Sequence, residues 1–156
     1  TPLYSSAASD VYKRQYQYLL FEQLQQNKDE QLAAICTKAL KEIKYHIRWS
    51  SEWVLRLGGG TPESKQRMLV AINELWRYTG EMFIAVDYEK EMNIDLIALQ
   101  NNWAEKVDVI FQEATLSIPQ NTFMQTGGKT GTHTENLGFI LTELQYMQRA
   151  YPNSQW

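Results

Sequence analysis

The fold is decided by the stretch Ala39-Leu40-Lys41-Glu42-Ile43-Lys44-Tyr45-His46-Ile47-Arg48-Trp49-Ser50, which lies in the middle of the longest periodic segment. Apolar side chains recur there with a period near 3.6, and the same stripe extends from Leu32 to Leu57. This period places Ile43 and His46 on the inward face of a helix and Glu42 on its flank. The stretch therefore predicts a long amphipathic helix with a histidine among its apolar residues.

Four further helices are expected on either side of it, over residues 16–27, 61–83, 94–116 and 132–151. Gly58-Gly59-Gly60 ends the long helix, because glycine adopts left-handed dihedrals freely. Asn27 or Asp29 can cap its start, Thr61-Pro62-Glu63 starts the next helix, and Thr132-x-x-Glu135 is a capping-box signature for the last. No strand pattern is found, so the sequence predicts an all-α domain with mostly short connections.

Three of these helices have an expected buried stripe. The side chains, in chain order, are Met68, Leu69, Ile72, Leu75, Trp76, Thr79, Met82 and Phe83; Ile97, Trp103, Val107, Ile110, Phe111 and Ala114; and Leu137, Ile140, Leu141, Leu144, Met147 and Tyr151. Residues 85–93 lack such a period and are expected to form a connector.

Composition restricts the class of protein. The chain has 156 residues, 44% of them hydrophobic, which suits one domain with a genuine core. Its net charge is −3 and its basic residues are scattered, which argues against a nucleic-acid binder with a broad basic surface. No apolar run approaches the roughly 18 residues of a membrane span. Cys36 is the single cysteine and lies on the apolar stripe, so we expect a core thiol and a reducing, cytoplasmic location.

Residues 1–15 differ from the rest of the chain. They are rich in small polar residues, show little helical periodicity, and resemble translated adapter sequence. We therefore interpret 1–15 as a non-native leader and expect the native domain to occupy 16–156, with its first helix starting at Tyr16.

His46 is the first candidate for metal chemistry. Di-iron carboxylate bundles use Glu-x-x-His, because a carboxylate and an imidazole three residues apart lie on one helical turn. Here Ile43 occupies the glutamate position, and Glu42 gives the spacing Glu-x-x-x-His. We interpret His46 as a core histidine, hydrogen-bonded or paired with Glu42, and predict no metal site and no catalytic residue in this chain.

Other candidate contact residues lie outside this turn. Gly127, Gly128 and Lys129 belong to a glycine-rich loop that lacks the first glycine and the preceding strand of a Walker loop, but could touch an anionic ligand or a partner. His133 and Glu135 lie at the expected start of the last helix, where a cap or a partner contact is favoured over catalysis. Aromatic and arginine side chains are favoured at interface centres, so Arg48 and Trp53 either face a partner or pack within the chain.

Several stretches together resemble one family. They are Gln31 to His46, Gly58 to Thr61, Ala71 to Thr79, Thr126 to Lys129, and His133 to Gly138 through Tyr151, Pro152 and Trp156. The chain from Tyr16 to Trp156 resembles the structural, non-catalytic C-subunit family of the bacterial phenylacetyl-CoA ring-epoxidase (1,2-epoxidase) complexes, which are multicomponent monooxygenases.

This resemblance implies a ferritin-like helical bundle that pairs with a homologous catalytic subunit. The di-iron cofactor would lie in that partner, with none in this chain, and His46 would be a vestigial ligand position beside Ile43. Since the family's proteins are longer, the resemblance implies an incomplete bundle, with the first two helices missing and apolar stripes exposed. It leaves open an indirect contact with phenylacetyl-CoA. Two alternatives remain at this point: an independent ferritin-like di-metal oxidase and a generic helical adaptor.

Overall fold

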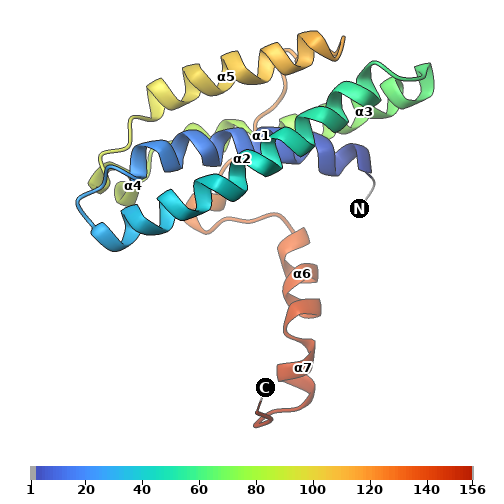
Figure 1. The fold of residues 1–156 in the computed structure, drawn as a ribbon. Helices are drawn as coiled ribbons and strands as arrows, with labels where there is room; N and C mark the ends of the chain where they lie inside the picture. Colours follow the sequence, from blue (N-terminus) through green and yellow to red (C-terminus); the bar gives the residue numbers. More distant parts are fainter. Residues whose placement is uncertain (1–2, 156) are drawn as a thin grey trace. The chain divides into compact units, whose positions relative to one another are not determined.

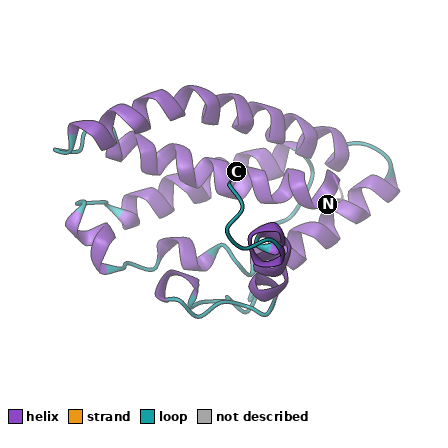
Figure 2. Ribbon diagram, turned by 90° about the horizontal axis from the view of Figure 1, so that it is seen from below, coloured by secondary structure: helices purple, strands orange, loops and turns teal. Residues whose placement is uncertain are grey.

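The computed structural model describes residues 3–155, and every regular element in that range is helical (Figures 1 and 2). The prediction of an all-α, ferritin-like helical fold is confirmed. The elements, in chain order, are α1 (Leu3–Leu24), α2 (Glu30–Gly58), α3 (Pro62–Trp76), the 3-10 turn η1 (Gly80–Phe83), α4 (Asp87–Glu91), α5 (Leu96–Glu113), the 3-10 turn η2 (Gly128–Thr130), α6 (Asn136–Leu144) and α7 (Tyr146–Ala150).

The chain divides into two compact units, residues 1–125 and residues 126–156. In the first unit α1 and α2 form a helical hairpin, and α3 and α5 both pack against it (Figure 1). The described part of the second unit contains η2, α6 and α7. None of the helices in residues 3–155 has both the length and the apolar character needed to cross a membrane.

The core of the first unit is aromatic. Tyr12, Trp76, Trp103 and Phe111 come from α1, α3 and α5, and their rings stack edge-on or tilted with centroids 5.2–6.4 Å apart. The Trp103 indole Nε1 donates a hydrogen bond of 2.9 Å to the Tyr12 carbonyl oxygen. Such contacts add to area burial, which is worth about 1.5–3 kcal/mol for a large apolar side chain.

The predicted start of the first helix at Tyr16 is wrong, because α1 begins at Leu3. Ala7, Ala8, Val11 and Tyr12 are buried, and they continue a stripe that reaches Leu19. Alanine is small and strongly helix-forming, so these residues form a packed helix despite their weak apolar pattern. Helix α1 crosses the boundary between residues 15 and 16; the foreign origin of residues 1–15 stays a prediction.

Helix α2 starts as predicted but ends for another reason. The Asp29 carboxylate accepts hydrogen bonds from the backbone N–H of Gln31 and Leu32, at 2.9 and 3.1 Å. At the other end, Gly58 does not adopt a left-handed conformation. A Cβ placed there would lie 2.6 Å from the Ala114 carbonyl oxygen, so glycine allows the close approach of the chain that follows α5.

The helix predicted over residues 61–83 has different bounds in the structure. Thr61 caps α3 as expected, through a 3.1 Å bond from the Ser64 N–H, but α3 ends at Trp76 rather than near Phe83. The Thr79 hydroxyl donates to the Trp76 carbonyl oxygen at 2.8 Å, and η1 replaces the last predicted turn.

The region predicted to be a connector contains the short helix α4, which buries Glu89. Helix α5 begins at Leu96 rather than Ile94, with the Asp95 side chain as its cap. Ile97 is 75% exposed, so its place in the predicted buried stripe is wrong; Leu96 and Leu99 are buried instead.

The second unit departs most from expectation. Helix α6 begins at Asn136, and Glu135 occupies the cap position without a side-chain capping bond. The predicted capping box from Thr132 to Glu135 is therefore wrong. The stripe predicted to be buried is exposed from Ile140 to Tyr151, because no described helix of this unit covers it.

Candidate functional site

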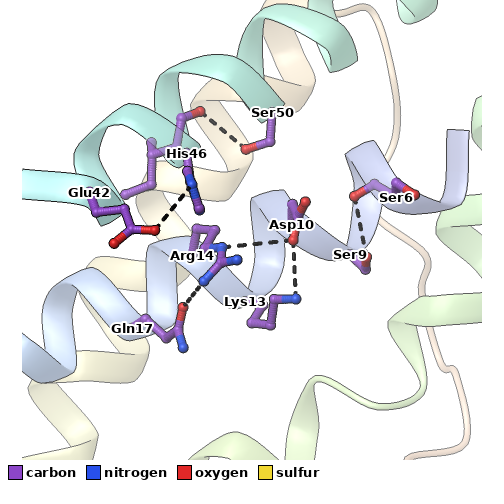
Figure 3. A network of polar contacts seen from close by, with 10 residues as sticks. Ser6, Ser9, Asp10, Lys13, Arg14, Gln17, Glu42, His46 and Ser50 are labelled. Atoms are coloured by element: carbon purple, nitrogen blue, oxygen red, sulfur yellow. Dashed lines mark hydrogen bonds and ion pairs between the residues drawn. The ribbon is translucent and has the colours of Figure 1, made fainter. Parts of the chain in front are cut away.

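His46 lies on α2, beside Glu42 and near Arg14 of α1 (Figure 3). Its imidazole Nε2 is 3.8 Å from Glu42 Oε1, and its side chain is 34% exposed. Ile43 is buried, as the helical period predicted. The prediction of an inward-facing pair is thus confirmed for Ile43, whereas His46 is only half-buried. The pairing of His46 with an exposed glutamate is an interaction that helices commonly use across one turn.

The surroundings of His46 come from α1 and from the next turn of α2. Asp10, Arg14, Tyr45 and Trp49 line a small hollow of about 240 Å³ together with His46. Asp10 pairs with Lys13 at 3.1 Å and with the Arg14 Nε at 3.8 Å. These charges are partnered within α1, as Figure 3 shows. Tyr45 and Trp49 give the hollow its aromatic walls.

The donor set around His46 falls short of what a metal ion requires. Within residues 3–155, no three side chains of the types His, Cys, Asp and Glu come together as a metal-binding group. Glu42 and His46 offer two donors, whereas protein sites for transition metals generally use three or four. The pair alone does not fit a di-iron centre.

A polar and aromatic surface runs along α2. Arg48, predicted to contact a partner, is 81% exposed, and its Nε donates to Glu52 Oε1 at 2.9 Å. That hydrogen bond raises the pKa of the Arg48 guanidinium above its usual value. Trp53 is half-buried, with its ring centroid 6.4 Å from that of Trp49 in an edge-on arrangement. The Arg56 guanidinium lies 5.5 Å from the Trp53 ring centroid, a cation–π distance.

Cys36 is buried on the inner side of the same helix, as predicted. Burial raises the pKa of its thiol, which keeps the sulfur protonated. A buried thiol of this kind is inert, so it contributes packing rather than nucleophilic chemistry.

The glycine-rich loop of the second unit closes on itself. Gly127 and Gly131 have φ of +110° and +91°, left-handed values that favour glycine. The Gly127 carbonyl oxygen accepts from the N–H of Thr130 at 3.0 Å and of Thr132 at 2.8 Å, and the Gly131 N–H donates to Gly128. Because these N–H groups close the turn, they do not form a phosphate cradle. Anion contact by Gly128 and Lys129 stays a prediction.

The predicted contact residues are divided between the two units. Arg48 and Trp53 belong to the first unit, whereas Gly127, Gly128, Lys129, His133 and Glu135 belong to the second. His133 and Glu135 are exposed just before α6. Five of the seven predicted contact residues therefore lie within one short segment, residues 127–135, which includes η2 and ends just before α6.

The resemblance implied exposed apolar stripes, and the second unit has such a surface on α6 and α7. Large apolar side chains of α6 and α7, of the kind normally buried in a core, are solvent-accessible. They are Phe139, Ile140, Leu141, Leu144, Tyr146 and Met147, followed by Tyr151. The amphipathic period was visible in the sequence, but periodicity does not say whether a partner helix lies in the same chain.

Two comparisons place the chain among known proteins. A model of the family described as phenylacetic acid catabolic protein matches residues 8–156. A curated relative from Escherichia coli (strain K12) is the C subunit of 1,2-phenylacetyl-CoA epoxidase. Over an alignment 158 residues long it is 44% identical to this chain, and the alignment covers 95% of this chain and 64% of the relative. The chain thus spans less than two thirds of that relative's length. On this match, the chain belongs to the phenylacetic acid catabolic protein family.

Proposed function

We propose that this chain acts as part of a non-catalytic structural subunit of a cytoplasmic phenylacetyl-CoA epoxidase complex, in aerobic phenylacetate degradation. It would bind a homologous catalytic subunit and shape or stabilise it. The name of the Escherichia coli relative supports this proposal, because that protein is a subunit of such an epoxidase. The family description supports the same catabolic setting.

The observation that carries the binding role is the exposed apolar surface of α6 and α7. Phe139 is 71% exposed, and no residue from 126 to 155 is buried. Covering one large apolar side chain contributes about 1.5–3 kcal/mol, so several such residues can offset the entropy cost of association. A surface of this kind is typical of a protein-binding segment.

The non-catalytic part of the proposal rests on the turn around His46. Ile43 supplies packing where a di-iron bundle needs a carboxylate, and Glu42 is the residue that pairs with the imidazole. We place the di-iron centre in the partner subunit, where it would supply the oxygen chemistry of epoxidation. The residues of this chain would then hold the partner in position.

Co-expression with the proposed di-iron catalytic subunit tests the pairing. We expect the two proteins to copurify through an affinity tag on either one, and the variant Phe139→Asp/Leu144→Asp to lose the partner. The control Thr142→Asp, on the same helix, adds one charge where no large apolar residue is removed. Failure of the unmodified chain to copurify would reject the proposal.

Iron analysis separates the structural role from an independent di-metal oxidase. After iron loading of this chain and of the complex, we expect stoichiometric iron only in the complex. Stoichiometric iron in this chain alone, reduced by His46→Ala, would instead support the oxidase. The control Gln17→Ala removes a nearby polar side chain that is no preferred iron ligand.

A further inference from the structure

The charge of the chain is distributed unevenly. Residues 30–58, which form α2, contain five basic and three acidic side chains, whereas the rest of the chain contains ten basic and fifteen acidic ones. Helix α2 is therefore a basic element in an acidic protein. All five of its basic side chains, Lys38, Lys41, Lys44, Arg48 and Arg56, are exposed.

Most of this positive charge lies on one face. Positions 38, 41, 45, 48, 52 and 56 recur at intervals of three or four residues, so they share one side of the helix. We name this set the α2 outer face; it comprises Lys38, Lys41, Tyr45, Arg48, Glu52 and Arg56. The buried residues of α2, such as Cys36, Ile43 and Val54, lie on the opposite side. The face extends over roughly 27 Å, given a rise of 1.5 Å per residue.

The centre of the α2 outer face has the side chains that binding sites favour. Tyr45 is 66% exposed, and it lies between Lys41 and Arg48 along the helix. Tyrosine and arginine are enriched at the energetically important positions of protein interfaces.

The arginines are held in place by neighbours on the same helix. Glu52 Oε1 lies 2.9 Å from Arg48 Nε, and Glu52 Oε2 lies 3.9 Å from Arg56 Nη2. The Trp53 ring supports the Arg56 guanidinium. One carboxylate shared between two guanidinium groups leaves a net positive charge and further N–H donors, on side chains that are 81% and 66% exposed.

We propose that the α2 outer face binds an acidic helical surface of the catalytic partner subunit. This inference rests on the proposed function. It adds which face of this chain binds the partner and the charge of the partner surface that it binds. Complementary carboxylates would pair with the basic side chains around Tyr45, and they would speed association as well as fix the register. A second copy presenting the same face is disfavoured, because the basic side chains would meet like charges.

Charge reversal with a matched control tests the proposal on the complex of this chain with the catalytic subunit. The outer-face variant is Lys41→Glu/Arg48→Glu, and the control is Lys106→Glu/Arg67→Glu. Each pair changes the net charge equally: Arg48 and Arg67 each have a glutamate partner one helical turn away, and Lys41 and Lys106 are exposed. Binding is measured by surface plasmon resonance or stopped-flow fluorescence at low and high salt.

We expect the outer-face variant to weaken binding about 10- to 100-fold at low salt, mainly through slower association, and the control to change it less than about threefold. Lys41→Gln/Arg48→Gln should fall in between, with circular dichroism confirming the helical fold of each variant. Equal effects in the outer-face and control variants would overturn the inference while leaving the proposed function intact. Absence of binding by the unmodified chain would reject the proposed function itself.

Two further outcomes identify another occupant and also overturn the inference. In the first, sedimentation shows that the unmodified chain self-associates and that Lys41→Glu/Arg48→Glu abolishes this while sparing partner binding. In the second, the chain binds vesicles of anionic phosphatidylserine through the same residues, and the catalytic subunit does not compete.

Discussion

Residues 3–125 bury aromatic side chains from three helices against one another, whereas residues 126–155 contain comparable apolar side chains without burying any of them. Both regions have helical periodicity. In the first unit α1, α2, α3 and α5 supply facing surfaces, so the stripes become a core. In the second, α6 and α7 present their stripes to solvent. An amphipathic stripe therefore indicates that a helix needs a covering surface, and that surface can lie outside the unit.

The largest expected effect uses two phenylalanines, one from each unit. Phe111 is fully buried among aromatic rings, and Phe139 is largely exposed. Phe111→Ala should cost about 3–5 kcal/mol in free energy of unfolding, because it leaves a cavity in the core. Phe139→Ala should change it by less than about 0.5 kcal/mol. Urea unfolding followed by tryptophan fluorescence measures both, and equal losses would contradict the contrast between the units.

A pair of glycines gives the next effect. In Gly58→Ala the new Cβ would collide with the Ala114 carbonyl oxygen, so we expect a loss of about 1–3 kcal/mol in unfolding free energy. At Gly138, inside α6, an added Cβ would have no atom within 4 Å apart from its two chain neighbours and the backbone of its own helix. Gly138→Ala should therefore raise the helicity of α6, worth up to about 1 kcal/mol. Thermal melting and circular dichroism report the two changes; a destabilising Gly138→Ala would show that α6 is packed in solution.

The sequence predicted those features that depend on local chemistry. Asp29 and Thr61 cap helices as expected, and Ile43 and Cys36 are buried, because capping and helical period are set by neighbouring residues. It failed where tertiary contacts decide. Small residues such as Ala7 pack in α1 although their pattern is weak.

The candidate site shows the same division. The sequence identified the Glu42–His46 pair, which follows from spacing along one helix. It named Arg48 as a candidate contact residue and left open whether that side chain is exposed. It could not show that Glu52 is shared by Arg48 and Arg56, or that the N–H groups after Gly127 close their own turn. Those facts depend on rotamers and backbone dihedrals, which residue spacing leaves undetermined.

The helix caps of the two units also differ, with a smaller expected effect on stability. Asp29 accepts two backbone hydrogen bonds at the start of α2, so Asp29→Ala should lower the unfolding free energy by about 1 kcal/mol. Glu135, at the same position of α6, accepts none through its side chain. Glu135→Ala should be neutral within about 0.3 kcal/mol, as expected of an exposed substitution that removes no cap. Chemical denaturation of both variants provides the measurement, and a loss at Glu135 matching that at Asp29 would indicate a capping bond formed in solution.

The smallest effect concerns the pH dependence of stability. Burial, followed by the charge and hydrogen bond of Glu89, raises the pKa of Tyr16 to about 12. Between pH 10 and 12 the unfolded chain ionises this tyrosine while the folded chain keeps its proton, so folding stability falls as pH rises through that window. Tyr16→Phe should remove the Tyr16 contribution to that fall, which is less than about 1 kcal/mol because solvent screens a half-buried ring. Tyr12 and Tyr18, whose pKa values are also raised, should keep their contributions. Tyr151→Phe, in the exposed stripe of the second unit, is the control. Guanidinium titrations at about pH 9, 10 and 11 compare the variants across the ordinary tyrosine range, and an unchanged slope in Tyr16→Phe would show that the Tyr16 hydroxyl is as accessible as an exposed one.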